Sequence, residues 1–283
     1  MSALPIEPPC FASTIRPAPH LDGEFDPAAV KAVLQGVGKV ARKWFRYQAS
    51  GLDRVPDEPT LLVGNHSGGK LPLDMMMFAE DWYRAFGYQR PLFALGHDLL
   101  FKVPPVGRRL RQIGAVPARP EHADALLAAG HSVLVMPGGD WETFRPWSDR
   151  YKVDFRNRRG FVKTALRRGV PITPVVTAGS HEMFVILTRG ERIARAVGLN
   201  RLRVYTFPIS LGFPFGLYVG PVPSPLPFPA RIETEVLEPV RLDGLRPEAA
   251  DDPEVVHRIY TEVMARMQAG MDRLSANRRP LFG

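Results

Sequence analysis

Hydrophobic residues recur along this chain with two alternating spacings, which predict helices and strands in turn. Over residues 27–46 apolar residues return every three or four positions, as on one face of a helix, and five basic residues occupy the rest of that surface. Short apolar runs bounded by turn-forming residues are typical of buried strands. Four such runs lie at 61–63, 92–95, 133–136 and 172–176.

Helical spacing separates these predicted strands. It predicts helices over 75–86 and over 98–112, and Pro104-Pro105 interrupts the second of these, which is basic. Pro120 and Gly130 mark the start and the end of a further helix. A last helix over 160–168 ends at Gly169. Strands that alternate with helices in this way pair into a mostly parallel sheet. The sequence therefore predicts an α/β fold, with a mixed, mostly parallel central sheet flanked by helices.

The pattern is looser in the last third of the chain. It predicts a helix over 186–197, a proline- and aromatic-rich segment over 208–229 and an edge strand over 231–237. Asp252-Pro253 then caps a long final helix. The apolar positions of that helix predict a stripe facing the core: Val256, Ile259, Val263, Met267 and Met271.

Composition divides the chain into three predicted parts. Residues 1–26 are rich in proline and form an extended arm, 27–50 hold the basic amphipathic helix, and 51–283 form one α/β domain. A basic amphipathic helix suits the surface of an anionic bilayer, but packing of its apolar stripe on the core is an equal alternative.

Charge and cysteine content indicate which kinds of binding partner and which cellular compartment to expect. The 283 residues carry a formal net charge of +8, which favours membrane surfaces, nucleic acid or phosphorylated substrates. The single cysteine, Cys10, cannot form an intrachain disulfide, and we expect a cytoplasmic protein. Because the chain lacks the roughly 20 consecutive apolar residues of a spanning helix, we expect membrane contact to be peripheral.

A histidine and an aspartate follow the first predicted strand. His66 comes directly after Asn65, and Asp74 lies eight positions further on, beyond a glycine-containing turn. An imidazole accepts a proton from a hydroxyl better when a carboxylate fixes its tautomer, so the pair is a candidate general base and its orienter. The alternative is a structural histidine with Asp74 capping the next helix, and spacing alone favours it.

A second glycine-rich turn, Pro137 to Arg145, follows the strand at 133–136 and lies at the same edge of the predicted sheet. The N–H groups of Gly138 and Gly139 are candidate donors to an oxyanion or phosphate. Glu142 would hold a substrate hydroxyl or an arginine, and Arg145 would meet an anion. A tight turn with a surface salt bridge explains these residues equally well.

Eight basic residues and one acid lie between positions 150 and 168. Their density suits the phosphates of a lipid or of coenzyme A, whereas a solvated helix face is the ordinary explanation of such a run. The eight are Arg150, Lys152, Arg156, Arg158, Arg159, Lys163, Arg167 and Arg168.

Four blocks in order give the chain a family resemblance. They are Asn65-His66 with Pro72-Leu73-Asp74, the turn 114–119 ending in Arg119, Pro137-Gly138-Gly139 with Glu142, and Val170-Pro171-Ile172. In this order the chain resembles the glycerolipid, or lysophospholipid, acyltransferases, especially the branch that contains the type-two diacylglycerol acyltransferases. Two departures are visible: seven residues separate His66 from Asp74, three more than is usual, and the common Glu-Gly-Thr-Arg of the third block is absent.

The resemblance implies a glycerol-3-phosphate acyltransferase-like fold and an O-acyltransferase of the phospholipid and glycerolipid pathways. A fatty acyl group would move from acyl-CoA or acyl carrier protein to a hydroxyl of a lysophospholipid or of a mono- or diacylglycerol at the membrane surface. His66 and Asp74 would be catalytic, and Asn65, Arg119, Gly138, Gly139, Glu142 and Arg145 would bind substrate. We expect no metal and no cofactor beyond the acyl donor.

Two other functions remain as alternatives. A non-catalytic peripheral lipid-binding protein would use the basic helix and the 207–222 segment, while a serine hydrolase using Ser67 is disfavoured because Asn65-His66 does not fit a nucleophile elbow. Nucleic-acid binding lacks a reader motif. For the membrane face we predict an exposed apolar rim, with a loop that covers the sheet as the alternative: Phe207, Phe213, Phe215, Leu217, Tyr218 and Phe228.

Overall fold

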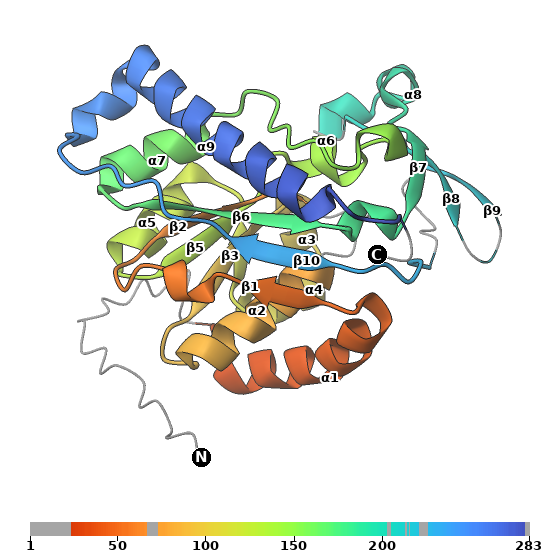
Figure 1. The fold of residues 1–283 in the computed structure, drawn as a ribbon, viewed down its shortest axis with the longest axis horizontal. Helices are drawn as coiled ribbons and strands as arrows, with labels where there is room; N and C mark the ends of the chain where they lie inside the picture. Colours follow the sequence, from red (N-terminus) through yellow and green to blue (C-terminus); the bar gives the residue numbers. More distant parts are fainter. Residues whose placement is uncertain are drawn as a thin grey trace.

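The computed structural model describes residues 24–66, 73–202, 205–212, 214, 216–220 and 226–280. Its main sheet has seven strands: β1 (Gln48–Ser50), β2 (Leu61–Gly64), β3 (Leu92–Gly96), β4 (Ala115–Pro117), β5 (Ser132–Val135), β6 (Ile172–Ala178) and β10 (Glu233–Val236). Their spatial order is β1-β10-β6-β2-β5-β3-β4 (Figure 1). The five strands from β6 to β4 are parallel, and β10 runs antiparallel to β6.

Helices cover both faces of this sheet (Figure 1). They are α1 (Pro27–Phe45), α2 (Leu73–Phe86), α3 (Asp98–Phe101), α4 (Pro104–Gln112), α5 (Pro120–Ala128), α6 (Gly139–Thr143), α7 (Gly160–Arg168), α8 (Glu191–Ala196) and α9 (Pro253–Ser275). A smaller antiparallel sheet, in the order β7-β8-β9, follows β6 along the chain. Its strands are β7 (Val185–Thr188), β8 (Ile209–Gly212) and β9 (Gly216–Val219).

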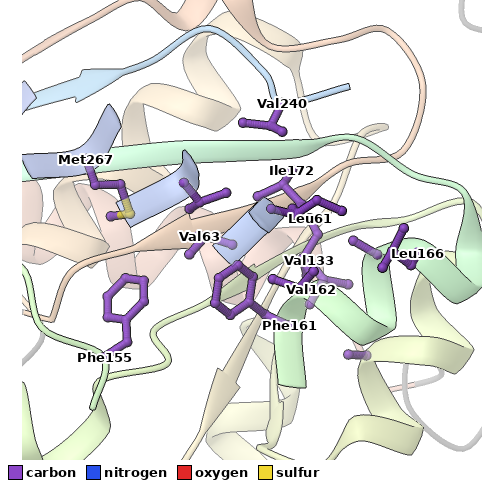
Figure 2. Close-up of a cluster of buried hydrophobic side chains, with 14 of the residues drawn as sticks. Leu61, Val63, Val133, Phe155, Phe161, Val162, Leu166, Ile172, Val240 and Met267 are labelled. Atoms are coloured by element: carbon purple, nitrogen blue, oxygen red, sulfur yellow. The ribbon is translucent and has the colours of Figure 1, made fainter. Parts of the chain in front are cut away.

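Alternation along the buried strands divides the core between the two faces. Leu61 and Val63 of β2 pack with residues of α5, α7 and α9, as Figure 2 shows for Phe161 and Met267. Leu62, between them, packs on the other face against α1 and α2. Both faces of β2 are buried, which is why this strand is apolar throughout. The predicted α/β fold with a mostly parallel sheet is confirmed.

The basic amphipathic segment is part of this core. Val30 and Leu34 of α1 are buried in the cluster that contains Trp82 of α2, and Arg42 pairs with Glu80 at 2.8 Å and with Asp81 at 2.5 Å. The next strand, β1, pairs with β10. Of the two interpretations of α1, core packing is therefore the observed one, and the sheet continues across the predicted boundary at residues 50 and 51.

The final helix begins where the sequence predicts. The side chain of Asp252 accepts hydrogen bonds from the N–H groups of Glu254 and Val255, at 2.8 and 3.3 Å, and so caps the start of α9. The five predicted core positions of this helix are all buried: Val256, Ile259, Val263, Met267 and Met271. The predicted apolar stripe is therefore confirmed as a core contact.

The structure after Gly179 differs from the sequence prediction. The helix predicted over 186–197 is instead the strand β7 followed by α8, separated at Gly190, whose φ of 62° is left-handed. The proline- and aromatic-rich segment at 208–229 contains the β8-β9 hairpin. The predicted edge strand at 231–237 corresponds to β10, which lies inside the sheet between β1 and β6.

The predicted apolar rim is only partly present. Leu217 is exposed, Phe207 and Phe228 are half-buried, and Tyr218 is buried. Phe213 and Phe215 lie outside the described residues, as does most of the predicted arm. In the described part of the chain, no helix is both long enough and apolar enough to cross a membrane.

Candidate active site

The end of β2 is fixed to its neighbour by a side chain. Beyond the pairing of Gly64 with Val175, the Asn65 amide donates to the Thr177 carbonyl at 2.9 Å and accepts from the Thr177 N–H at 2.8 Å. Asn65 is buried, so both bonds are shielded from water. Its role in this structure is to continue the β2-β6 ladder by one residue and to place His66 at the carboxyl edge of the sheet.

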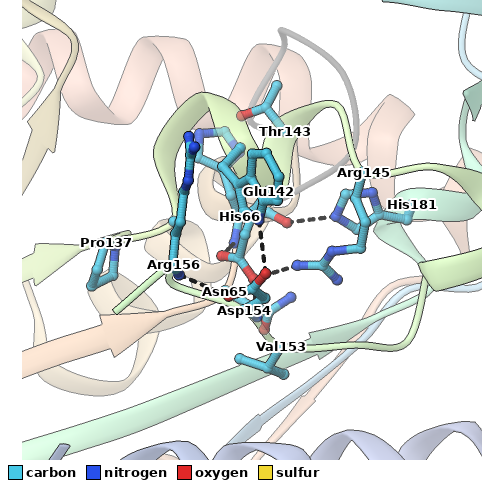
Figure 3. A network of polar contacts seen from close by, with 12 residues as sticks. Asn65, His66, Pro137, Glu142, Thr143, Arg145, Val153, Asp154, Arg156 and His181 are labelled. Atoms are coloured by element: carbon cyan, nitrogen blue, oxygen red, sulfur yellow. Dashed lines mark hydrogen bonds and ion pairs between the residues drawn. The ribbon is translucent and has the colours of Figure 1, made fainter. Parts of the chain in front are cut away.

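The backbone of His66 is held from two sides (Figure 3). Its N–H donates to Oε2 of Glu142 at 3.0 Å, and its carbonyl accepts from Nε2 of His181 at 2.9 Å. His66 as a residue is half-buried. The arrangement fixes its main chain while the residue stays partly exposed to solvent.

The Gly138-Gly139 turn makes room for Glu142. A Cβ at Gly138 would lie 2.2 Å from Cγ of Glu142, and Gly139 has a left-handed φ of 49°. The Gly139 N–H closes the turn by donating to the Met136 carbonyl at 3.1 Å. That donor was predicted to bind an oxyanion, but here it is occupied within the turn, and the two glycines serve to place the Glu142 carboxylate.

Glu142 and Arg145 form an ion pair in the interior, with exposures of 0% and 2%. Arg145 donates to Oε1 of Glu142, and the Asp154 N–H donates to the same oxygen at 3.1 Å. Burial raises the pKa of Glu142, while Arg145 and the N–H groups of His66 and Asp154 lower it. Because Arg145 and the N–H groups of His66 and Asp154 are all donors, the carboxylate form of Glu142 fits these contacts. Of the two roles predicted for Glu142, the structure shows the arginine contact.

Arg145 keeps unused hydrogen-bonding capacity. In the described residues, its Nε and Nη1 atoms have no hydrogen-bond partner although both are buried. A buried donor without a partner costs free energy. Arg145 therefore stays a candidate for an anionic group, as predicted, but it lies inside the protein and not on an open surface.

His181 belongs to the same network and was not among the predicted site residues. It is buried, and burial together with the nearby Arg145 guanidinium holds its pKa well below the ordinary value of 6.5. The imidazole is therefore neutral near pH 7, and its bond to the His66 carbonyl assigns the proton to Nε2. A signal was available in the sequence, because His181 follows β6 just as His66 follows β2.

Asp74 lies in the first turn of α2 and is buried. Its Oδ1 atom accepts from the Met75 N–H at 2.8 Å, as expected of a residue near a helix start. Residues 67–72, which join His66 to Asp74 and include Ser67, lie outside the described residues.

Arg119 is separate from this network. It precedes α5, its side chain is more than half exposed, and its Nε lies 3.5 Å from the Asp98 carboxylate. Since Arg119 follows β4 and Asp98 follows β3, the pair also lies at the carboxyl edge of the sheet.

Most of the basic run at 150–168 has partners within the protein. Arg158 donates to the carbonyls of Pro137 and Gly138 at 2.9 and 3.0 Å and so braces the glycine turn. Arg156 stacks on Trp141, and Arg159 lies over Tyr260. Arg167 and Arg168 pair with Asp251 and Asp124. Most of these basic side chains therefore stabilise the fold, although their density in the sequence suggested phosphate binding.

Comparison with known proteins places this site in a family. The acyltransferase family model matches residues 46–178. An uncharacterized protein of Mycobacterium tuberculosis is 33% identical over 262 residues, covering 92% of this chain and 70% of that protein. A bovine protein named DGAT1/2-independent enzyme synthesizing storage lipids is 28% identical over 209 residues, covering 73% of this chain and 60% of that one.

A solved structure shares the fold. The 1-acyl-sn-glycerophosphate acyltransferase PlsC of Thermotoga maritima superposes with a TM-score of 0.50 at 20% identity, covering 88% of this chain and 83% of that one. The chain belongs to the acyltransferase family and is an O-acyltransferase. The family resemblance stated from the four sequence blocks is confirmed.

Proposed function

We propose that this protein transfers a fatty acyl group from acyl-CoA or acyl carrier protein to a hydroxyl of a lysophospholipid or of a mono- or diacylglycerol at a membrane surface. Membership of the acyltransferase family supports the reaction class. The names of the bovine and Thermotoga relatives, which refer to storage lipids and to an acyl-glycerophosphate, support a glycerolipid acceptor.

His66 is the general base in this proposal. Its imidazole takes the proton of the acceptor hydroxyl as the oxygen attacks the thioester carbonyl carbon, and a tetrahedral oxyanion forms. When the C–S bond breaks, the imidazolium returns the proton to the leaving thiolate. The acyl group passes directly to the acceptor, with no acyl-enzyme, and no metal or redox cofactor takes part.

Asp74 would orient His66, and Arg145 would bind an anionic group of donor or acceptor. The buried position of Asp74 near the start of α2 suits a carboxylate that stays fixed during turnover. Arg145 is chosen because two of its buried donors have no partner among the residues that the structure describes. Arg119 and the Gly138 N–H remain candidates for substrate contact at the same edge of the sheet.

One observation carries the assignment of His66 above the others. Its backbone is fixed through both its N–H and its carbonyl by buried side chains of two different elements, Glu142 and His181, while the residue itself is only half-buried. Catalytic groups need this combination, because a small misplacement of the reacting atom costs a large factor in rate.

The test is His66→Ala, assayed with labelled acyl-CoA or acyl carrier protein against a panel of lysophospholipids and mono- and diacylglycerols. Loss of the general base is expected to reduce kcat by about 10²- to 10⁴-fold with an unchanged thermal transition. His257→Ala, at an exposed position of α9, is the matched control and is expected to keep full activity. Near-wild-type turnover by folded His66→Ala protein would refute the assignment. Vesicle binding without turnover of any acceptor by the wild type would favour the lipid-binding alternative.

A further inference from the structure

The small sheet β7-β8-β9 exposes its apolar side. Ile186, Ser210 and Tyr218 are buried, one on each strand. The alternate positions are apolar and exposed: Leu211 by 39%, Leu217 by 57% and Val219 by 53%, with Leu187 of β7 at 49%. Leu211 pairs with Leu217 and Ile209 with Val219, so these side chains form adjacent rows on one face.

The segment that contains this sheet is rich in arginine. Residues 185–220 contain five arginines and one acid, Glu191. On α8 and at Val197, which directly follows it, exposed Arg192 and Arg195 alternate with the exposed apolar residues Ile193 and Val197. Apolar side chains beside basic ones are the combination that binds the interface of an anionic bilayer, where the former enter the acyl boundary and the latter meet headgroups.

A second surface of the same composition is formed by α3 and α4. Leu100, Val103 and Val106 are exposed by 44–51%. Residues 98–112 contain four basic residues and one acid, Asp98, which lies beside Arg119. This segment therefore repeats the pairing of exposed apolar and basic side chains.

The topology places both surfaces at the edge of the sheet that carries His66. β7 follows the carboxyl end of β6, and α3 follows the carboxyl end of β3. In the sheet order, β6 and β3 lie on opposite sides of β2, whose carboxyl end leads to His66. Figure 1 shows β7, β8 and β9 beyond the end of the central sheet, on the side where α6 lies.

We propose that the outer face of β7-β8-β9 docks on a bilayer containing anionic lipid, with the exposed side of α3-α4 as a second contact on the other flank of His66. The proposal rests on the proposed function and deepens it, because it assigns the surface that brings the site to its lipid acceptor. A second copy of the chain is the less favourable occupant, since pairing two such faces would bring their arginines together, whereas anionic headgroups neutralise them.

The experiment measures flotation of the full chain with vesicles of phosphatidylcholine alone or mixed with phosphatidylglycerol. We expect the wild type to prefer the anionic vesicles and Leu211→Glu/Leu217→Glu to bind them at least about tenfold more weakly. Leu100→Glu/Val106→Glu is expected to weaken binding in the same direction. Ala265→Glu/Ala269→Glu, at exposed positions of α9, adds the same two charges elsewhere and should bind like the wild type.

Two further variants separate a failure of folding and a failure of the chemistry from a failure of docking. Leu211→Ser/Leu217→Ser provides a milder change if the glutamate variant does not fold, as judged by circular dichroism. His66→Ala should float like the wild type, so a failure of the proposed chemistry is distinguishable from a failure of docking. Equal binding by wild type and the folded Leu211/Leu217 variants, or absence of binding by the wild type, would overturn the proposal. So would a dimer in solution that these substitutions dissociate without loss of vesicle binding.

Discussion

The network around His66 and the outer face of β7-β8-β9 depart from the ordinary rule that apolar side chains are buried and charged ones are exposed. The two regions depart from it in opposite directions. The first places an ion pair, Glu142 with Arg145, and a neutral histidine, His181, in the interior. The second places leucine and valine in solvent. Both departures cost folding free energy, and natural proteins concentrate such departures where function requires them.

The two regions also differ in how they depend on the rest of the fold. The polar network joins the ends of β2, β5 and β6 through named hydrogen bonds, so loss of one member leaves others unpaired. The leucine and valine side chains of the outer sheet face have no hydrogen-bonding groups, so replacing one of them leaves no neighbour unpaired. Substitutions in the network should therefore affect stability and rate together, whereas those on the outer face should chiefly affect membrane binding.

The largest effect on stability is expected from breaking the buried ion pair. Glu142→Ala leaves the Arg145 charge without its partner, and we expect the free energy of unfolding in urea to fall by about 3–5 kcal/mol. Glu262→Ala removes the exposed partner of Arg266 on α9 and should cost less than about 1 kcal/mol. Equal costs for the two variants would show that the interior pair is no more important than a surface pair.

A double variant sharpens this result. Glu142→Leu/Arg145→Met replaces both charges by apolar groups and should recover much of the lost stability, because neither charge is left alone in the interior. Turnover should stay low, since the His66 N–H loses its acceptor. Recovery of both stability and turnover would show that Glu142 does not position His66.

A smaller effect is expected from Gly138→Ala. The new Cβ would overlap Cγ of Glu142, and displacement of the carboxylate should cost about 1–3 kcal/mol of stability and lower kcat. Gly36→Ala is the matched control, since a Cβ there has nothing within 4 Å and Gly36 lies within α1. That substitution should stabilise the protein by about 0.4–1 kcal/mol. Equal changes in the stability of the two variants would contradict the claim that Glu142 leaves no room for a Cβ at Gly138.

The smallest effect is the pH dependence contributed by His181. Its pKa is depressed on folding, so the unfolded chain binds the additional proton as pH falls. Its contribution to stability is present above the ordinary value of 6.5 and is lost below it, by up to about 1.4 kcal/mol per pH unit. Urea titrations of wild type and His181→Gln at several pH values should show a shallower acid slope for the variant. An unchanged slope would show that His181 is not held neutral.

Much of the fold could be predicted from the sequence because local signals agreed with burial. The apolar runs of β2 and β5 are continuous because both faces of the sheet are covered. Asp252 and Gly169 mark a helix start and a helix end. The helix predicted over 186–197 failed because apolar and basic residues recur there at helical spacing on both sides of Gly190. Three-residue strands such as β1 and β4 are too short to show a period.

The site could be predicted only in part. The proximity of His66 to Glu142 follows from parallel pairing of β2 with β5, which brings both turns to one edge. The interior position of Glu142 and Arg145 does not follow, because charged residues in a glycine turn are ordinarily solvated. It depends on the cover supplied by residues distant in the sequence, such as Asp154 and His181.

The position of β10 has a consequence for where this protein can be divided. The family match ends at residue 178, yet β10 lies between β1 and β6, and Met267 and Met271 of α9 are buried in the main core. A fragment limited to residues 46–178 would leave the β6 edge open and uncover the apolar face that α9 protects, which are the conditions for aggregation. We therefore expect that an independently folding unit of this protein must include β10 and α9 in addition to the segment matched by the family model.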